Sequence, residues 1–182
     1  MSVVRVIRHG DCPEIAWKNG GGTTREIAVF PPGAGISDFL WRISIARVES
    51  AGPFSAFDGV DRVLAVLEGK LELRGPNVSA DLDDASAPFA FDGGTEVTGR
   101  PLDGPVLDLN AMARRGAYNI DVRRVWTGDT VSCNGTTFLF ALAPQTVGNA
   151  TLGYRDSAEI RATIVAGGDA LIMSARPWGD AD

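Results

Sequence analysis

The chain of 182 residues has very few of the side chains that bind transition metals. It contains one histidine, His9, and two cysteines, Cys12 and Cys133, which lie far apart in the sequence. Protein sites for zinc and similar metals combine several histidine, cysteine or carboxylate ligands. We therefore expect no metal and no cofactor. Because the sequence places no serine or cysteine nucleophile beside His9, a catalytic triad has no support either.

The sequence also lacks long apolar runs and an excess of basic residues. No stretch approaches the roughly 20 apolar residues that a membrane helix requires, and Arg5 and Arg8 interrupt the first apolar segment. Its 23 acidic and 17 basic residues give a net charge of -6, which would repel nucleic acid and anionic membranes. We expect a cytoplasmic protein with reduced cysteines and with neither nucleic acid nor membrane as a partner.

Short apolar segments separated by turn residues predict an all-β fold. Glycine accounts for 22 of the 182 residues, and Asn-Gly or Asp-Gly pairs recur along the chain. Such pairs suit tight turns between the strands of a sandwich or barrel. The expected strands cover residues 3–8, 23–30, 40–48, 62–67, 70–74, 87–91, 106–109, 118–125, 137–143, 158–165 and 170–174. One short helix is predicted at residues 109–115, because basic residues and a glycine follow a potential N-cap there.

The block WKNGGGTTRE at residues 17–26 is the strongest indication of a binding site. Glycines let the backbone approach a ligand closely. The flanking side chains supply hydrogen-bond donors and acceptors, including positively and negatively charged groups. The alternative is an ordinary Asn-Gly hairpin loop. The block is not a phosphate-binding loop, which requires Gly-Lys-Ser/Thr at its end. The residues expected to bind a ligand here are Lys18, Asn19, Gly20, Thr24, Arg25 and Glu26.

The strand expected at residues 40–48 has two different faces. Alternation places the odd-numbered residues from Trp41 to Ile45 on one face, and Arg42 with Ser44 on the other. Arg42 and Ser44 either line a polar cavity or face water on an open sheet. A buried arginine without a partner costs several kcal/mol, so an inward Arg42 needs an acidic neighbour or an anionic ligand. Glu26 is the nearest candidate partner.

Further basic residues extend the candidate site. Asp61 and Arg62 follow an aromatic segment and would point in opposite directions on an extended strand, so they need different partners. Arg114 and Arg115 could hold an anion, but basic residues are also expected in the last turn of a helix. The cations Lys18, Arg25, Arg42 and Arg62 suit a small carboxylate, since hydrogen bonds to charged groups contribute about 1.5–3 kcal/mol each.

Four segments resemble the HutD/Ves family of small cupin-like proteins: residues 17–26, 41–46, 54–62 and 105–116. The resemblance is clear up to about Gly116 and looser beyond it. It implies a cupin-type β-barrel or jelly roll, in the form of a compact bicupin. Residues 1–115 would form the barrel that carries the pocket, and residues 116–182 the second barrel half. The resemblance also implies an association with bacterial histidine utilisation.

Three functions are compatible with these observations. The first is a metal-independent regulatory protein that binds a small carboxylate, such as urocanate or formylglutamate, in histidine utilisation. The second is a metal-free isomerase or hydrolase in which Glu26 acts as the general base, and an ion pair to Arg42 would argue against it. The third is a protein-interaction module with a vestigial pocket, which an exposed apolar patch and a filled interior would indicate.

We expect the purified protein to contain no stoichiometric transition metal, because one histidine and two distant cysteines are too few for a common site. Elemental analysis of the protein after dialysis against a chelator checks this. About one metal ion per chain, retained through chelation, would contradict the expectation.

Overall fold

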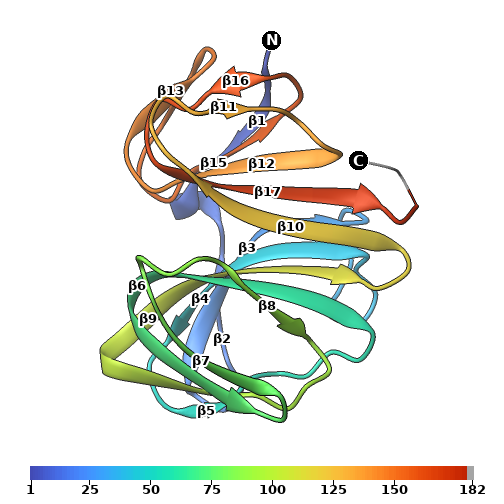
Figure 1. Cartoon of the computed structure of the whole chain (residues 1–182), viewed down its shortest axis with the longest axis vertical. Coiled ribbons are helices and arrows are strands. Elements are labelled where there is room, and N and C mark those ends of the chain that lie inside the picture. Colours follow the sequence, from blue (N-terminus) through green and yellow to red (C-terminus); the bar gives the residue numbers. More distant parts are fainter. Residues whose placement is uncertain (180–182) are drawn as a thin grey trace.

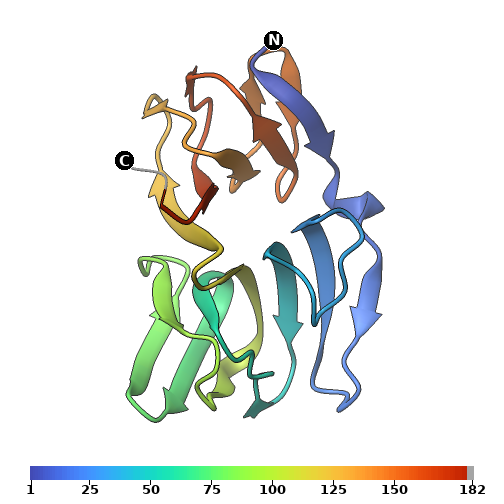
Figure 2. The same ribbon diagram turned by 90° about the vertical axis from the view of Figure 1, so that its right-hand side faces the viewer.

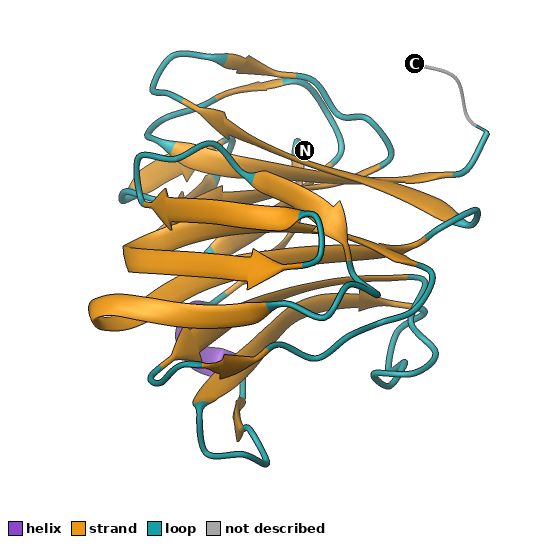
Figure 3. Cartoon of the chain, turned by 60° about the horizontal axis from the view of Figure 1, so that its bottom comes forward, coloured by secondary structure: helices purple, strands orange, loops and turns teal. Residues whose placement is uncertain are grey.

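The computed structural model describes residues 1–179, whose regular secondary structure is almost entirely β-strand (Figures 1 and 3). Two antiparallel sheets dominate the fold, and two small two-stranded sheets accompany them. The only helical element among the described residues is a three-residue 3-10 turn, η1 (His9–Asp11). No helix within residues 1–179 is long and apolar enough to cross a membrane. The predicted all-β class is therefore confirmed.

The larger sheet has eight strands and comes from residues 14–114. Its main strand order is β2-β3-β4-β9-β6-β7, with β5 paired to β9 and β8 paired to β6. The strands are β2 (Glu14–Ala16), β3 (Gly22–Phe30), β4 (Trp41–Val48), β5 (Gly52–Pro53), β6 (Val60–Gly75), β7 (Val78–Asp83), β8 (Phe89–Asp92) and β9 (Thr98–Arg114). Where two strands were predicted around Gly69, β6 continues as one strand. Its register shifts on both sides of Glu68, and Gly69 takes a positive φ of 85°.

The smaller sheet has five strands in the order β1-β15-β12-β17-β10. The strands are β1 (Val3–Ile7), β10 (Tyr118–Val125), β12 (Thr136–Ala141), β15 (Ser157–Ile160) and β17 (Ala170–Pro177). Two short pairs accompany it, β11 (Thr130–Val131) with β16 (Ile164–Val165), and β13 (Gln145–Val147) with β14 (Ala150–Leu152). Strand β1 pairs with β15, so the first strand of the chain belongs to the sheet formed mainly by the C-terminal part (Figure 2).

The core between the two sheets is built on one face of β4. Trp41, Ile43 and Ile45 are buried there, in a cluster that also contains Phe138 of β12 and Met173 of β17. The rings of Trp41 and Phe138 meet edge to face at 5.8 Å. The even-numbered residues of β4 occupy the opposite face, as alternation predicted. Together with residues of β3, β6 and β9, this strand packs the larger sheet against the smaller one, and its other face supplies a wall of the site described below.

The helix predicted at residues 109–115 is wrong, because this segment is the end of β9. Residues Leu109 to Ala113 pair with β4 on one side and β6 on the other, and they are buried. A central strand that is covered on both faces consists of a run of apolar residues without clear alternation. From the sequence alone, such a run cannot be told from a buried helix. Arg115 is consequently not a helix-end cation, and it pairs instead with Asp61 and Asp92.

Replacing Phe138 with alanine should lower the free energy of unfolding by about 3–5 kcal/mol, because its ring is fully buried between the two sheets. Urea denaturation followed by tryptophan fluorescence measures the change. Trp126→Ala removes an aromatic ring that is 55% exposed and should cost much less. Equal losses in the two variants would mean that the sheets do not share a core.

Candidate functional site

A cavity of about 620 Å³ lies against the face of β4 that points away from the core between the sheets. Arg42, Ser44 and Ala46 of β4 line it, so the cavity interpretation of this strand holds and the open-sheet alternative does not. The remaining lining comes from β2, β3, β5, β6 and β9 and from the connecting loops. Three cations line the cavity, Lys18, Arg42 and Arg62, and among residues 1–179 no aspartate or glutamate does.

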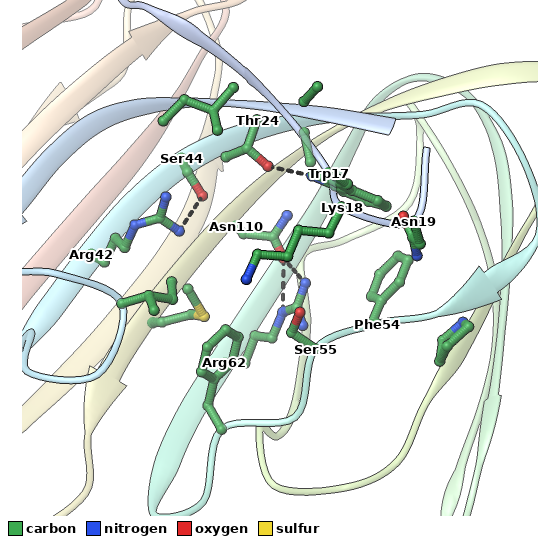
Figure 4. A pocket seen from close by; sticks show the side chains of 17 residues that line it. Trp17, Lys18, Asn19, Thr24, Arg42, Ser44, Phe54, Ser55, Arg62 and Asn110 are labelled. Carbon is green, nitrogen blue, oxygen red and sulfur yellow. Dashed lines mark hydrogen bonds between the residues drawn. The ribbon is translucent and has the colours of Figure 1, made fainter. Parts of the chain in front are cut away.

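Arg62 is the most firmly held of these cations. It is only 8% exposed, and its Nε and Nη2 atoms donate hydrogen bonds to Oδ1 of Asn110 at 2.8 and 2.5 Å (Figure 4). The guanidinium lies 5.0 Å from the ring centroid of Phe54 and 5.3 Å from that of Phe91, within the range of cation-π attraction. Its Nη1 atom has no hydrogen-bond partner within residues 1–179. The Arg62 guanidinium is therefore held in place, and its Nη1 atom can still donate a hydrogen bond to a ligand.

Asp108 precedes Asn110 by two residues on β9. It is the last member of a buried hydrogen-bonded chain that runs from Arg62 through Asn110. Nδ2 of Asn110 donates to Oδ1 of Asp108, whereas Oδ2 of Asp108 has no partner among residues 1–179. Burial raises the pKa of Asp108 to about 7, and the Arg62 charge and the Asn110 hydrogen bond oppose this rise. Burial also lowers the pKa of Arg62 to about 10. Arg62 is thus charged at neutral pH, where Asp108 titrates.

Arg42 has a different environment. Its Nε atom donates to Oε2 of Glu26 at 2.9 Å, and its Nη1 atom donates to Oγ of Ser44 at 3.4 Å. Glu26 stands opposite Ser44 in the β3–β4 register, so the predicted Arg42–Glu26 pairing is confirmed. Glu26 is not among the residues that line the cavity. The ion pair removes the basis for assigning Glu26 as a general base.

The glycine block forms the turn between β2 and β3 and contributes only part of its side chains to the cavity. Lys18, Asn19 and Thr24 line the cavity, and Trp17 beside them donates from Nε1 to Oγ1 of Thr24 at 2.7 Å. Lys18 points into the cavity (Figure 4) and has no ion-pair partner within residues 1–179. The block is therefore more than a hairpin loop, since it places a cation at the site.

Besides Glu26, two more of the residues predicted to bind a ligand in this block lie outside the cavity lining. Gly20 occupies the turn with a positive φ of 71°, which suits glycine. Arg25 pairs with Glu14 at 3.1 Å and donates to the carbonyl oxygen of Cys12 at 2.5 Å. Alternation explains this placement, because Arg25 projects from the side of β3 opposite to Thr24.

Sequence reasoning missed Asn110 and Asp108 as parts of the site, because Asn110 was placed in the helix predicted at residues 109–115 and Asp108 was taken as a possible cap of that helix. The available signal was the spacing of two polar residues by two positions inside a buried apolar run, which places both on one face of a strand. The apolar part of the lining includes Ile15, Trp17, Ile36, Phe54, Phe57 and Met112. Within residues 1–179, no group of three or more histidine, cysteine or carboxylate side chains is placed to hold a metal ion.

The fold recurs in proteins of very different sequence. YhhW of Escherichia coli, a bacterial pirin, aligns with a TM-score of 0.63 at 9% identity, over 95% of this chain and 98% of the other. This likeness defines an all-β fold class and nothing finer. The HutD family model matches residues 9–176, and the chain belongs to the HutD family.

Individual relatives agree with this assignment. The structure of HutD from Pseudomonas fluorescens SBW25 aligns with a TM-score of 0.87 at 30% identity, covering 96% of this chain and 99% of that one. An uncharacterized 21.2 kDa protein from the hutC 3' region of Pseudomonas putida is 37% identical over 78% of this chain and 75% of its own. Protein Ves of Citrobacter koseri is 42% identical over 61% of this chain, and the match spans 58% of its length.

Gly22→Ala should destabilise the protein by about 1–3 kcal/mol, because a Cβ atom there would overlap the carbonyl oxygen of Arg47 and come within 3.2 Å of the Trp17 ring. Denaturant unfolding measures the loss. Gly10→Ala is the matched control, since no atom lies within 4 Å of the added methyl group. Similar stability of the two variants would contradict the close approach of β3 and β4 at Gly22.

Proposed function

We propose that the chain binds a small carboxylate in this cavity and acts as a metal-independent regulatory protein of histidine utilisation in the cytoplasm. The observation that carries the proposal is a cavity that three cations and, among the described residues 1–179, no aspartate or glutamate line, in a chain of net charge -6. Arg62 is buried, and a buried cation is costly unless an opposite charge meets it. An anionic ligand would meet Arg62 at its free Nη1 donor, with Lys18 beside it.

The lining favours an organic anion over a bare inorganic one. Aromatic and aliphatic side chains such as Trp17, Ile36 and Phe54 surround the cations, and neutral groups such as Asn19 and Ser55 supply further hydrogen bonds. The volume falls in the usual range for small-molecule sites. Urocanate and formylglutamate both combine carboxylate groups with an organic body of suitable size. The name of the Pseudomonas putida relative, which places it beside hutC, supports the link to histidine utilisation.

The two other functions have weaker support. A metal-free enzyme would need a proton acceptor at the cavity. Glu26 does not line the cavity, and its carboxylate accepts a hydrogen bond from Arg42. An interaction module would be marked by a filled interior, whereas an open cavity lies against the larger sheet. Incubation of the protein with both carboxylates, followed by chromatography of the mixture, separates binding from turnover.

We also propose that the architecture is a compact bicupin, with residues 1–115 and 116–182 as its two barrel units. Each unit has an aliphatic cluster of its own, around Leu71 and Val106 in the first and around Leu139 and Ile172 in the second. Strand β1 would then be exchanged, since residues 3–7 pair with the second unit.

Arg62→Met should weaken carboxylate binding by at least about tenfold, because a lost hydrogen bond to a charged group costs about 1.5–3 kcal/mol. Isothermal titration calorimetry with urocanate and with formylglutamate at pH 6.5 measures the affinity. At that pH Asp108 is largely protonated, so the substitution does not leave a buried unpaired charge.

Arg123→Met is the control, because Arg123 is exposed on β10, remote from the cavity lining. Arg42→Met should have a smaller effect than Arg62→Met, since Glu26 already offsets the charge of Arg42. A folded Arg62→Met variant with unchanged affinity for both carboxylates would exclude Arg62 as the anchor.

A further inference from the structure

We infer that the cavity takes up its anion together with one proton, and that Asp108 is the residue that receives this proton. Asp108 would then be a positioning residue that acts on the ligand through Asn110 and Arg62. The inference rests on the proposed carboxylate-binding function and specifies how that binding depends on pH.

The geometry around Asp108 disfavours its ionised form. The residue is fully buried in β9, between Ala46 of β4 and Val66 of β6. One carboxylate oxygen accepts a hydrogen bond from Asn110, and the other has no partner within the described part of the chain. An ionised carboxylate with an unsatisfied oxygen in such a place is costly, and a proton removes most of that cost.

The charges that act on Asp108 are few. The neighbouring strands bring apolar residues to it directly, and the nearest cation on this face is Arg62 of β6. Farther along β4 lies Arg42, which is already paired with Glu26 of β3. Among residues 1–179, Arg62 is thus the one charged residue whose electrostatic attraction stabilises an ionised Asp108.

An anion at Arg62 changes this balance. The bound carboxylate and Asp108 would share one buried cation, and two negative charges near each other disfavour ionisation of the weaker acid. The pKa of Asp108 is about 7 in the free protein, so ligand binding raises it further. The complex therefore holds a proton at pH values where the free protein has partly lost it. By linkage, affinity is constant below about pH 6 and falls as the pH rises above 7.

The hydrogen bond of Asn110 explains why this proton matters for the ligand. Because Oδ1 of Asp108 accepts from Nδ2 of Asn110, the amide oxygen of Asn110 faces Arg62 and holds two of its donor atoms. A neutral Asp108 still accepts that hydrogen bond through its carbonyl oxygen. The guanidinium keeps its position. A neutral Asp108 no longer offsets its positive charge, so Arg62 attracts the anion more strongly.

The test is calorimetric titration of formylglutamate at pH 6.5, 7.5 and 8.5, each in two buffers of different ionisation enthalpy. The carboxylates of formylglutamate are ionised throughout this range, whereas urocanate carries an imidazole that titrates near neutrality. For the unmodified protein we expect uptake of a fraction of a proton at pH 7.5 and 8.5. The Kd should rise about three- to tenfold from pH 6.5 to pH 8.5.

Asp108→Asn imitates the neutral carboxyl group and can accept the same hydrogen bond from Asn110. It should bind formylglutamate without proton uptake, and its Kd at pH 8.5 should match the unmodified protein at pH 6.5 within about twofold. Asp121→Asn, which changes an exposed carboxylate on β10, is the matched control and should behave as the unmodified protein. Proton uptake that persists in Asp108→Asn overturns the inference, as does binding without uptake in the unmodified protein.

Denaturation without ligand provides an independent measurement. Because the native pKa of Asp108 lies above its unfolded value near 3.9, its protonated form stabilises the native state, and this contribution is lost between about pH 4 and 7. The stability of the unmodified protein relative to Asp108→Asn should therefore fall across that range and level off above it. A constant difference overturns the inference. Failure of both carboxylates to bind at any pH overturns the proposed function, and the inference with it.

Discussion

The burial of the Arg62 guanidinium is the constraint on which the site depends. An arginine in this position would be strongly destabilising without partners. Two aromatic faces, the Asn110 amide and the Asp108 carboxyl group offset the cost together. Arg62 stands opposite Met112 in the β6–β9 register, so Asn110 lies two residues along on the same face of β9. A shift of this register by one residue would turn Asn110 away and leave the cation unpaired.

The two faces of β4 connect stability with function. On one face, Trp41 and its neighbours form the core between the sheets, and on the other, Arg42 and Ser44 line the cavity. The smaller sheet packs its own interior with aliphatic side chains such as Leu139 and Ile172. The larger sheet also has an aliphatic cluster, but it buries the polar and charged groups of Arg62, Asp108 and Asn110 in addition. This difference between the interiors explains why the candidate site lies in the N-terminal part of this HutD family member.

The two arginines of the site, Arg62 and Arg42, contribute differently to its electrostatics. Arg42 has a carboxylate partner on the neighbouring strand, so most of its charge is compensated before a ligand arrives. Arg62 has only an indirect link to Asp108, whose own ionisation burial disfavours. The positive character of the cavity therefore comes mainly from Arg62 and Lys18. An acidic chain can maintain a cationic cavity in this way because, in the part of the chain that the structure describes, no aspartate or glutamate lines the cavity.

Local patterns in the sequence determined a large part of this protein. Period-two alternation identified both faces of β4, the turn residues indicated the all-β class, and the proximity of β3 and β4 in the chain made the Arg42–Glu26 pair predictable. Only the tertiary structure decided the rest. The Arg62–Asn110–Asp108 chain joins strands that are far apart in the sequence. The end of β9 was predicted as a helix because both of its faces are buried. Such contacts depend on the pairing of distant strands, which local periodicity does not encode.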